Sequence, residues 1–214
     1  LGDMPVQLAR PVLVTAGQTV IIEPAEYGMR NYVAIRGGLI ADSELGSSAT
    51  DVLSGLGPAP VSAGDILGVL PRSTGMTDGQ LANPLRVSQS NDGRTVATLR
   101  CVLGPRDNWF GDNVQQFLDT EWTVSSHSNR VGLRLDSDTT VERVLDGELP
   151  SEGMVAGSVQ IPPNGKPVLF LRDHAVTGGY PVIATVLDED IDIAAQLPPG
   201  ALVRFEVKGN THDH

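Results

Sequence analysis

The amino-acid sequence predicts a mainly β protein of two lobes with few short helices. It contains 24 glycines and 15 prolines, 39 of 214 residues, or about 18% against roughly 12% in average soluble proteins. This excess favours short strands joined by turns, and short runs of β-branched residues recur between Gly, Pro, Asn and Asp. A polar segment at 76–93 is typical of a linker. It separates a first lobe, 1–75, from a second lobe, 94–208, and a tail at 209–214 follows.

Charge and composition narrow the classes of partner. The net charge of −11 repels phosphate backbones, so nucleic acid is not an expected partner. No apolar run approaches the roughly 20 residues that span a bilayer, and no membrane partner is expected. The single cysteine, Cys101, excludes an internal disulfide, fits a reducing cytoplasmic compartment and is expected in the core. The start of the chain does not resemble a signal peptide, and because it has Leu1 in place of Met we expect a fragment or a processed product.

The first lobe is predicted to consist of short strands. Runs of β-forming residues between turn residues indicate strands at 6–8, 11–14, 19–22, 30–36 and 66–70. Between the last two runs, Thr50 and the Ser and Asp residues beside it suit the N-terminus of a short helix. The same residues also suit a polar surface turn.

The second lobe repeats the pattern with stronger alternation. Strands are predicted at 95–103, 122–124, 131–135, 153–159, 167–171, 181–187 and 201–207, with one more at 85–87 in the linker. These runs alternate apolar and polar residues or are continuously apolar, as in half-buried and fully buried strands.

Two helical segments and a hairpin turn complete the second lobe. The clearest helix, 113–120, has three apolar residues on one face, namely Val114, Phe117 and Leu118. Asp112 or Asn113 suits the N-cap position of this helix. Residues 188–196 suit one helical turn, and Asn164-Gly165 predicts a hairpin turn.

A polar link between two predicted strands runs from 172 to 180. A plain hairpin needs two to five loop residues, whereas this link has nine and carries Asp173, His174, Thr177 and Gly178-Gly179. Two adjacent glycines allow positive φ and close approach of a ligand, so the link suits a binding loop. The same residues also suit a Gly-Gly turn that the Asp173 side chain closes.

Two further polar stretches flank predicted strands. Asn129 and Arg130 lie at the entry of the strand 131–135. The guanidinium of Arg130 can hold a carboxylate or phosphate bidentately, or it can pair with a protein carboxylate such as Glu152. Glu152 and Gln160 flank a Gly-bounded strand. Because strand ends meet at the mouth of a barrel, we expect these four side chains and residues 173–180 to line one cleft.

Known catalytic motifs do not narrow the chemistry further. The sequence contains no P-loop, H-E-x-x-H, G-x-S-x-G or dinucleotide fingerprint. Only His127 and His174, of four histidines, fall in predicted structured regions. Two imidazoles and one aspartate are a weak ligand set, so no metal is predicted.

Several sequence blocks in fixed order resemble one family over about residues 11–207. In the second lobe they are S-N-R-V-G-L-R, S-E-G, V-Q-I-P and D-H-A-V-T-G-G-Y-P-V-I-A, at 128–134, 151–153, 159–162 and 173–184. In the first lobe they are Y-V-A-I-R-G-G, L-G-S-S-A-T-D and A-G-D, at 32–38, 45–51 and 63–65. These blocks look like the biotin-dependent carboxyltransferase-like family. Its members are named allophanate hydrolase subunit 2, KipA or the C subunit of 5-oxoprolinase.

The chain departs from the family pattern at three places. Family members normally open with a further Gly-rich segment that bears Asp and Arg, so we expect the first lobe to lack part of its family N-terminus. Where Arg-Ser-Thr-Asp is common, this chain has Ser48-Ala49-Thr50-Asp51. His174 stands where arginine is common. The identity of the substrate is therefore left open.

The resemblance implies two β-barrel lobes, the second of them cyclophilin-like. It implies a partner of the type known as allophanate hydrolase subunit 1, KipI or the B subunit of 5-oxoprolinase, together with a LamB-type subunit. The first hypothesis is a subunit, inactive alone, of a hetero-oligomeric hydrolase that opens the cyclic amide 5-oxoproline with ATP bound by the assembled complex. A second is a carboxyltransferase module that moves a carboxyl group from carboxybiotin to urea or a related amide. A third is a KipA-like regulatory binding protein. The chain has no Met-Lys-Met signal for covalently attached biotin.

An amide substrate gives the predicted site residues their roles. Arg130 and the backbone N–H groups of Gly178-Gly179 would donate to the carbonyl oxygen. Asp173 would accept the substrate N–H or act as general base, a role that His174 can also take. The predicted catalytic residues are thus Arg130, Asp173 and His174. The predicted substrate-binding residues are Asn129, Glu152, Gln160, Thr177, Gly178, Gly179 and Tyr180.

Overall fold

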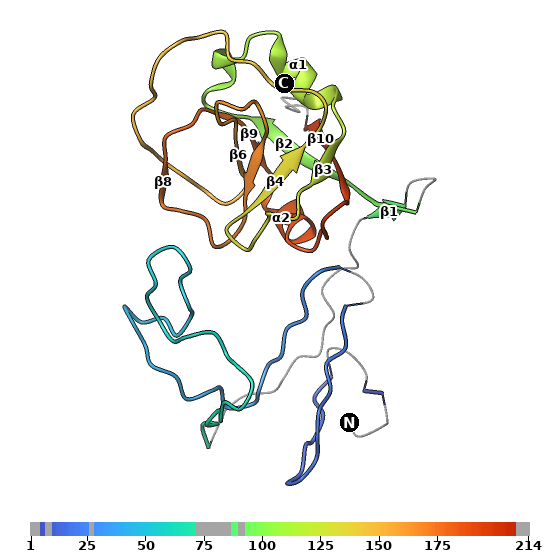
Figure 1. Cartoon of the computed structure of the whole chain (residues 1–214), viewed down its shortest axis with the longest axis vertical. Helices are drawn as coiled ribbons and strands as arrows, with labels where there is room; N and C mark the ends of the chain where they lie inside the picture. The colour runs from blue at the N-terminus through green and yellow to red at the C-terminus, as the bar shows by residue number, and fades with distance from the viewer. Residues whose placement is uncertain (1–4, 7–9, 26–27, 72–86, 90–92, 209–214) are drawn as a thin grey trace, which may run out of the picture. The chain divides into compact units, whose positions relative to one another are not determined.

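The computed structural model describes residues 5–6, 10–25, 28–71, 87–89 and 93–208 (Figure 1). The chain separates into two compact units, residues 1–26 with 30–84 and residues 27–29 with 85–214. The tail at 209–214 and most of the predicted linker lie outside the described residues. So do parts of the strands predicted at 6–8 and 85–87. The predicted boundaries of the two lobes stay predictions.

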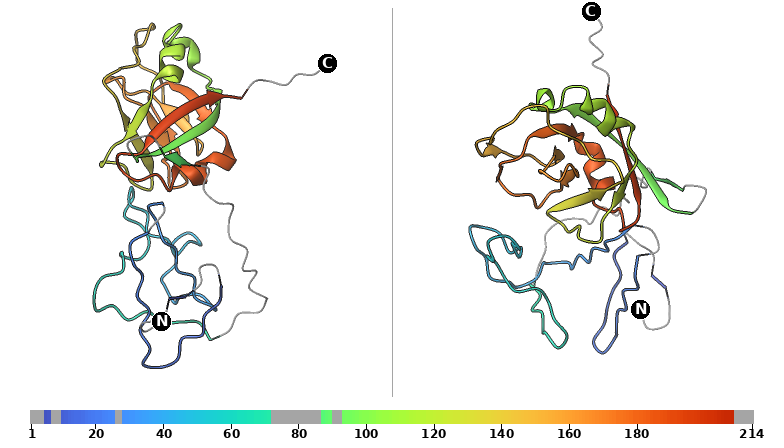
Figure 2. Two further views of the ribbon diagram at one scale, coloured as in Figure 1. Left: turned by 90° about the vertical axis from the view of Figure 1, so that its right-hand side faces the viewer. Right: turned by 45° about the horizontal axis from the view of Figure 1, so that its top comes forward.

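The second unit contains a closed β-barrel. Its strands are β1 (Ser88–Gln89), β2 (Thr95–Leu103), β3 (Trp122–Val124), β4 (Gly132–Asp136), β6 (Ser158–Gln160), β7 (Val168–Phe170), β9 (Val182–Val186) and β10 (Leu202–Val207). Seven strands close in the order β2, β10, β3, β4, β7, β6, β9 and back to β2, and β1 adds to β2 outside the ring (Figure 2). β10 runs parallel to β2, whereas the other pairs are antiparallel.

Alternation along the strands fills the barrel interior. In β2 the side chains of Ala97, Leu99 and Cys101 are fully buried, because successive side chains of a strand point to opposite faces. Leu133 and Leu135 of β4 follow the same rule. Burial raises the pKa of the Cys101 thiol to about 11, with a smaller contribution from Glu206. Cys101 is thus a core residue, as predicted.

Two α-helices lie at opposite ends of the barrel (Figures 1 and 2). The helix α1 spans Asn113–Asp119 and buries Phe117, whose ring stacks on Phe205 of β10 at 4.6 Å between centroids. Its N-cap residue is Asp112, but the Asp112 side chain makes no capping hydrogen bond. Asn113 does not cap the helix either, because its Nδ2 donates to the Glu142 carbonyl at 3.0 Å. The predicted helix is confirmed, and Asp112 occupies the N-cap position that was predicted for Asp112 or Asn113, but its side chain does not cap the helix.

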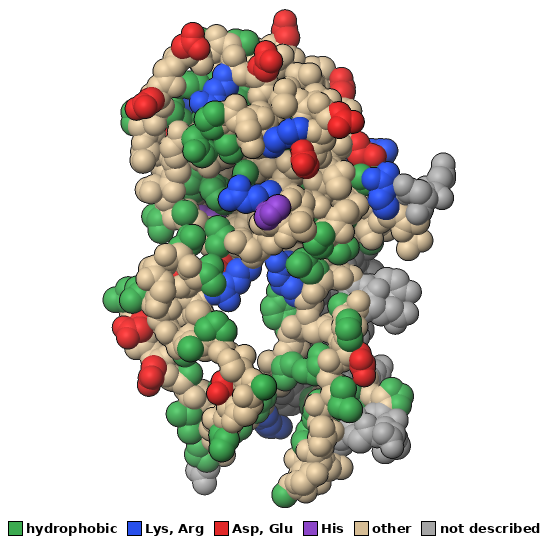
Figure 3. All heavy atoms as spheres, viewed as in Figure 1, with side chains coloured by type: hydrophobic (Ala, Val, Ile, Leu, Met, Phe, Trp, Pro, Cys, Tyr) green, Lys and Arg blue, Asp and Glu red, His purple; other side chains and the backbone are tan. Residues whose placement is uncertain are grey.

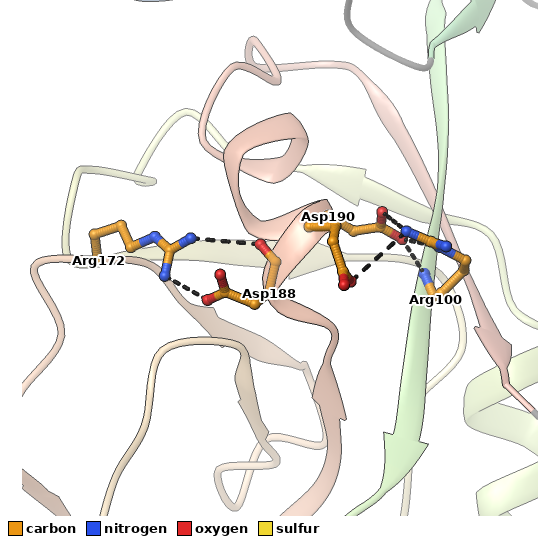
Figure 4. Close-up of polar contacts among 5 residues, drawn as sticks. Arg100, Arg172, Asp188 and Asp190 are labelled. Atoms are coloured by element: carbon orange, nitrogen blue, oxygen red, sulfur yellow. Dashed lines mark hydrogen bonds and ion pairs between the residues drawn. The ribbon is translucent and has the colours of Figure 1, made fainter. Parts of the chain in front are cut away.

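The helix α2 spans Asp188–Ala194 and carries two arginine–aspartate pairs (Figure 4). Asp190 is 2% exposed and accepts three hydrogen bonds from Arg100 of β2. The donors are the backbone N, Nε and Nη2, at 2.8, 2.9 and 2.7 Å. Arg172 donates through Nη1 to Asp188 at 2.6 Å, and both of these side chains are exposed. The first pair anchors α2 to the barrel wall, and the second lies in solvent.

The first unit lacks the predicted strands in its described residues. In 10–25 and 28–71 the pairing consists of two isolated bridges, Leu39 with Val69 and Glu44 with Ser47. A strand needs a cross-strand partner and a buried face, whereas Leu13 is 81% and Tyr32 80% exposed. Hydrophobic side chains lie on the surface of this unit (Figure 3). The strands predicted at 11–14, 19–22, 30–36 and 66–70 are therefore wrong for the described residues.

The helix suggested near Thr50 is a turn. Asp51 accepts hydrogen bonds from the Leu53 backbone N–H at 2.9 Å and from the Ser54 hydroxyl at 2.6 Å. This Asx turn satisfies the local donors without a helix. The polar surface turn, the other interpretation of this segment, is correct.

In the second unit most predicted elements form. β2, β3, β4, β7, β9, β10 and α1 lie within about two residues of the predicted bounds. The Asn164-Gly165 hairpin joins β6 to β7, which pair through Val159 with Leu169. The linker contributes β1 at Ser88–Gln89, next to the segment predicted at 85–87. No described helix is long and apolar enough to cross a membrane.

Candidate functional site

The polar link between β7 and β9 is built around a second, smaller sheet. β8 (Thr177–Gly178) pairs with β5 (Glu152–Gly153), with Glu152 opposite Gly178 and Gly153 opposite Thr177. The pairing continues where the Met154 N–H donates to the Val176 carbonyl at 2.9 Å. The link is therefore fixed by a ladder and not by the predicted Gly-Gly turn.

Gln160 is the buried centre of this region. Its side chain is 4% exposed, and its Nε2 donates to the Tyr180 carbonyl at 2.9 Å and contacts the Met154 sulfur at 3.2 Å. The β6–β9 register shifts between Val159 and Gln160. β-Bulges of this kind redirect side chains. The bulge therefore lies at Gln160, whose side-chain amide contacts the link between β7 and β9.

Gly178 makes room for Gln160. A Cβ on Gly178 would lie 2.4 Å from Gln160 Nε2, closer than real side chains approach. Gly178 and Gly179 are not among the positive-φ glycines, so the expected use of positive φ is wrong at both positions. The close approach that was also expected is present at Gly178.

Glu152 pairs with Arg106 and not with Arg130. Arg106 follows β2, and its Nε lies 3.1 and 3.2 Å from the two carboxylate oxygens, with a further short contact from Nη2. The hydrogen bond from Arg106 holds the pKa of Glu152 below its usual value, against the opposing effect of burial. Glu152 is thus an ionised partner of Arg106, and Arg130 pairs with a different carboxylate.

Arg130 and Asp173 come together as predicted for a shared site. Arg130 Nε lies 2.8 Å from Asp173 Oδ2, and both side chains are partly exposed. The contact is an ion pair, since Asp173 Oδ2 accepts no hydrogen bond from the residues that the structure describes. Asn129 is occupied beside it, because its Oδ1 accepts from the backbone N–H groups of Val131 and Gly132 at 2.9 and 3.3 Å. Asn129 therefore shapes the loop that presents Arg130.

His174 follows Asp173 with a defined ring orientation. Its Nδ1 lies 2.8 Å from the Ala175 carbonyl, and because a carbonyl only accepts, Nδ1 carries the proton in this contact. The Nε2 then holds the lone pair. The ring tilts by 43° against Phe170, with 6.3 Å between centroids. This tautomer leaves Nε2 as a proton acceptor.

The predicted residues thus form two groups. One contains Arg130, Asp173 and His174, with Asn129 as a loop former. The other contains Glu152, Gln160 and Gly178 around the small sheet, with Thr177 and Tyr180 exposed at its edge and Gly179 open to solvent. The first group offers a cation and a carboxylate, and the second offers the Glu152 carboxylate, which Arg106 pairs, together with hydrogen-bonding groups. Whether one ligand contacts both groups stays a prediction.

Two arginines of this region were missed in the sequence. Neither Arg106 nor Arg143 was singled out in the sequence. Arg143 Cζ lies 5.8 Å from the centroid of the Tyr180 ring, within cation–π range. Both are long-range contacts that no local pattern encodes, although the excess of acidic residues indicated that arginines would pair. Among the described residues no group of three His, Cys, Asp or Glu side chains is arranged to hold a metal ion.

A cavity of about 390 Å³ lies in the same unit. Its walls come from two segments, and the lining residues are Thr140, Val141, Glu142, Arg143, Pro162, Pro163, Asn164 and Gly165. None of the predicted site residues lines this cavity.

Comparison with known proteins relates residues 1–207 to one family. A family model described as carboxyltransferase domain, subdomain A and B, matches residues 1–207. The C subunit of 5-oxoprolinase from Escherichia coli (strain K12) is 34% identical over 194 residues, which cover 89% of this chain and 60% of that protein. The same-named protein of Haemophilus influenzae is 33% identical over 214 residues, 96% of this chain and 65% of that protein. The chain thus spans less than two thirds of both relatives.

Further matches are to longer proteins, of which this chain covers a smaller share. A urea amidolyase of Lachancea kluyveri is 25% identical over 228 residues, 96% of this chain and 12% of that protein. A crystal structure of TTHA0988 matches with a TM-score of 0.68 and 30% identity, over 86% of this chain and 34% of that one. Kluyveromyces lactis urea carboxylase shares the fold with a TM-score of 0.73 at 23% identity, over 86% of this chain and 18% of that one.

Proposed function

The chain belongs to the carboxyltransferase domain, subdomain A and B family, and from this premise we propose that it is one subunit of a hetero-oligomeric, ATP-dependent hydrolase acting on a cyclic amide of the 5-oxoproline type. The observation that carries the proposal is the 34% and 33% identity to two proteins named as the C subunit of 5-oxoprolinase. The identity to urea amidolyase is lower, at 25%.

Ring opening of a cyclic amide sets three chemical demands. Water adds to the carbonyl carbon, the C–N bond breaks, and a proton passes to the departing nitrogen. The carbonyl oxygen needs a donor as it gains negative charge, and the water needs a base. Arg130 would supply the donor. His174 Nε2 or Asp173 would take the proton from water and return it to nitrogen.

The Arg130–Asp173 pair supports these roles by its geometry. The Nε–Oδ2 contact of 2.8 Å fixes the guanidinium beside the carboxylate, and both side chains are partly exposed. His174 lies next in the chain with its Nε2 lone pair unused by the Ala175 contact. A donor and an acceptor therefore stand beside each other at the exposed end of β7.

The remaining expectations belong to the same proposal. We propose that the barrel is cyclophilin-like and that the first unit completes a second β lobe. Catalysis would need a partner of the type found as the B subunit of 5-oxoprolinase, and a LamB-type subunit. ATP would bind to the assembled complex, in the cytoplasm.

The test is reconstitution. The full-length protein is combined with its partner subunits, and ATP-dependent release of glutamate from 5-oxoproline is measured. Asp173→Asn and His174→Gln should each be compared with Asp138→Asn, which changes an exposed carboxylate that is not among the predicted site residues. Loss of a general base lowers turnover about 10²–10⁴-fold. No turnover by the wild-type complex, despite tight partner binding, would refute the proposal and favour a KipA-like regulatory role.

A second candidate is transfer of a carboxyl group from carboxybiotin to urea. The match to urea amidolyase over 96% of the chain and the description of the family model favour it. Urea-dependent loss of carboxybiotin, measured with the same preparation, separates the two candidates.

A further inference from the structure

The turn that follows β2 is fixed against the first residues of β9. The Gly104 N–H donates to the Ile183 carbonyl at 2.8 Å, and the Arg106 N–H donates to the Val182 carbonyl at 3.2 Å. A Cβ on Gly104 would lie 2.4 Å from the Val182 carbonyl oxygen, so the turn approaches β9 as closely as a glycine permits. The backbone of Arg106 therefore has a defined position relative to β9.

The guanidinium of Arg106 extends from this turn to the small sheet. Its Nε lies 3.1 and 3.2 Å from the two carboxylate oxygens of Glu152 on β5, and Nη2 makes a further short contact with Oε1. Both side chains are partly exposed, so the pair is expected to affect global stability only slightly. Its two-point geometry nevertheless fixes the direction of both side chains, which a single point charge would not do.

Arg106 thereby holds the chain on both sides of Gly179. On one side, Glu152 lies opposite Gly178 in the β5–β8 ladder. On the other side, the Arg106 N–H binds the Val182 carbonyl. Only three residues separate Gly178 from Val182, so Gly179 cannot move far unless one of the two attachments is broken.

Gly179 offers a hydrogen-bond donor that the described part of the protein does not use. Its N–H has no partner among the residues that the structure describes, and the residue is exposed. Apart from its chain neighbours, the atom nearest to a Cβ built on Gly179 is the Leu149 carbonyl oxygen at 4.0 Å. Of the two glycines predicted to supply donors, Gly178 belongs to the ladder, whereas the N–H of Gly179 is available to a ligand.

We propose that Arg106 is a positioning residue that holds the Gly179 N–H where it donates to the carbonyl oxygen of the substrate. The inference rests on the proposed function, and it adds a second donor beside Arg130 for the oxygen as it gains negative charge. It also assigns Glu152 a different role from the predicted one. The Glu152 carboxylate anchors Arg106 and does not contact the substrate.

The positioning is tested first on the full chain without partner subunits. Arg106→Lys keeps the charge and loses the two-point contact. We expect amide hydrogen exchange at Met154, whose N–H is bonded across the β5–β8 ladder, to accelerate at least threefold, and the Gly179 amide resonance to shift. Exchange at Val124, whose N–H is bonded elsewhere in the barrel, should stay the same. Either an unchanged exchange rate at Met154 or an unmoved Gly179 resonance overturns the proposal.

The contribution to catalysis is tested in the reconstituted complex with 5-oxoproline and ATP. Arg106→Lys should lower kcat at least tenfold and change KM less than threefold, because the donor acts mainly in the transition state. Glu152→Gln should have a similar effect, and the double variant should lose no more than either single variant, since both break one contact. The matched control is Arg204→Lys, which alters an arginine paired with Glu121 at 2.6 Å and should keep full activity.

The outcomes separate positioning from a structural role. A structural ion pair would lower the melting temperature and leave kcat of the folded variants unchanged, and that result overturns the proposal. Additive losses in the double variant overturn it as well. If Arg106→Lys does not fold, Glu152→Gln supplies the same measurements. A wild-type complex without turnover counts against the proposed function alone, and exchange on the free chain then decides whether Arg106 positions Gly179.

Discussion

The barrel and the first unit use similar residues with opposite results. Both contain runs of Val, Ile and Leu between glycines and prolines. In the barrel Ile183 is fully buried, while in the first unit Ile66 is 96% exposed. The barrel strands have a hydrogen-bonded neighbour on each side, whereas the described part of the first unit has two isolated bridges. The comparison teaches that an alternating pattern of apolar residues is not enough to form a sheet. A sheet forms only where each strand also has a hydrogen-bonded neighbour.

The largest expected difference in stability is between an Ile→Ala substitution in the barrel and the same substitution in the first unit. Ile183→Ala should lower the free energy of barrel unfolding by about 2–5 kcal/mol, the usual cost of a cavity in a packed core. Ile66→Ala should change it by less than about 0.5 kcal/mol. Both tryptophans, Trp109 and Trp122, belong to the barrel unit, so their fluorescence during urea unfolding is the measurement. Equal effects of the two substitutions would break the comparison.

The next effect compares the two pairs on α2. Asp190→Ala should destabilise the barrel by about 2–3 kcal/mol, because it leaves the half-buried Arg100 and its backbone N–H without their acceptor. Asp188→Ala removes an exposed pair and should cost less than about 1 kcal/mol. Urea midpoints of the two variants check the difference. A similar loss in both would show that burial does not distinguish these pairs.

A smaller effect is expected within the β5–β8 ladder. Gly178→Ala places a methyl group 2.4 Å from Gln160 Nε2, whereas the Cβ position at Gly153 has nothing within 4 Å. Overpacking of this kind costs about 1–3 kcal/mol. Gly178→Ala should therefore lower stability and displace the Gln160 amide resonance, and Gly153→Ala is the matched control. A Gln160 amide resonance that stays in place in Gly178→Ala would contradict the packing argument.

The smallest effect is the pH dependence from Glu152. Arg106 lowers the folded pKa of Glu152 below its ordinary value of 4.5. A carboxyl group with a lowered folded pKa contributes stability above its unfolded pKa and loses it as pH falls through the folded pKa. Below about pH 4.5, Glu152→Gln should therefore lose less stability than the wild type. Parallel curves of melting temperature against pH would show that the pair contributes nothing.

Local patterns predicted the barrel well because its strands and helices can be recognised from a few consecutive residues. The alternation in 95–103 and the apolar face of 113–120 reappear as β2 and α1. The strands of the first unit were not predictable in the same way, since the residues of 19–22 have β propensity but no described partner. The β propensity of a residue describes how well its side chain suits a pleated, half-buried position in a sheet. It does not supply the partner strand or the burial that such a position needs.

The candidate site was predicted in part for the same reason. Arg130 and Asp173 belong to two polar stretches at strand ends, and the antiparallel pairing of β4 and β7 brings their flanking loops together. Arg106 and Arg143 were not found this way, because neither belongs to the polar stretches that the sequence singled out, although each contacts a residue of those stretches, Glu152 and Tyr180. Gly178 was noticed for its backbone freedom, but its function in the fold is to leave space for Gln160.

The parallel pairing of β10 with β2 has a consequence for synthesis on the ribosome. Val96 pairs with Leu202 and Cys101 with Val207, so the ring cannot close until the last strand has emerged. At about 5–20 residues per second, one edge of β2 waits on the order of ten seconds for its neighbour. During that interval Leu99 and its neighbours are exposed to other nascent chains and to chaperones. The order of translation therefore makes β10 the strand whose arrival ends the vulnerable period of the barrel.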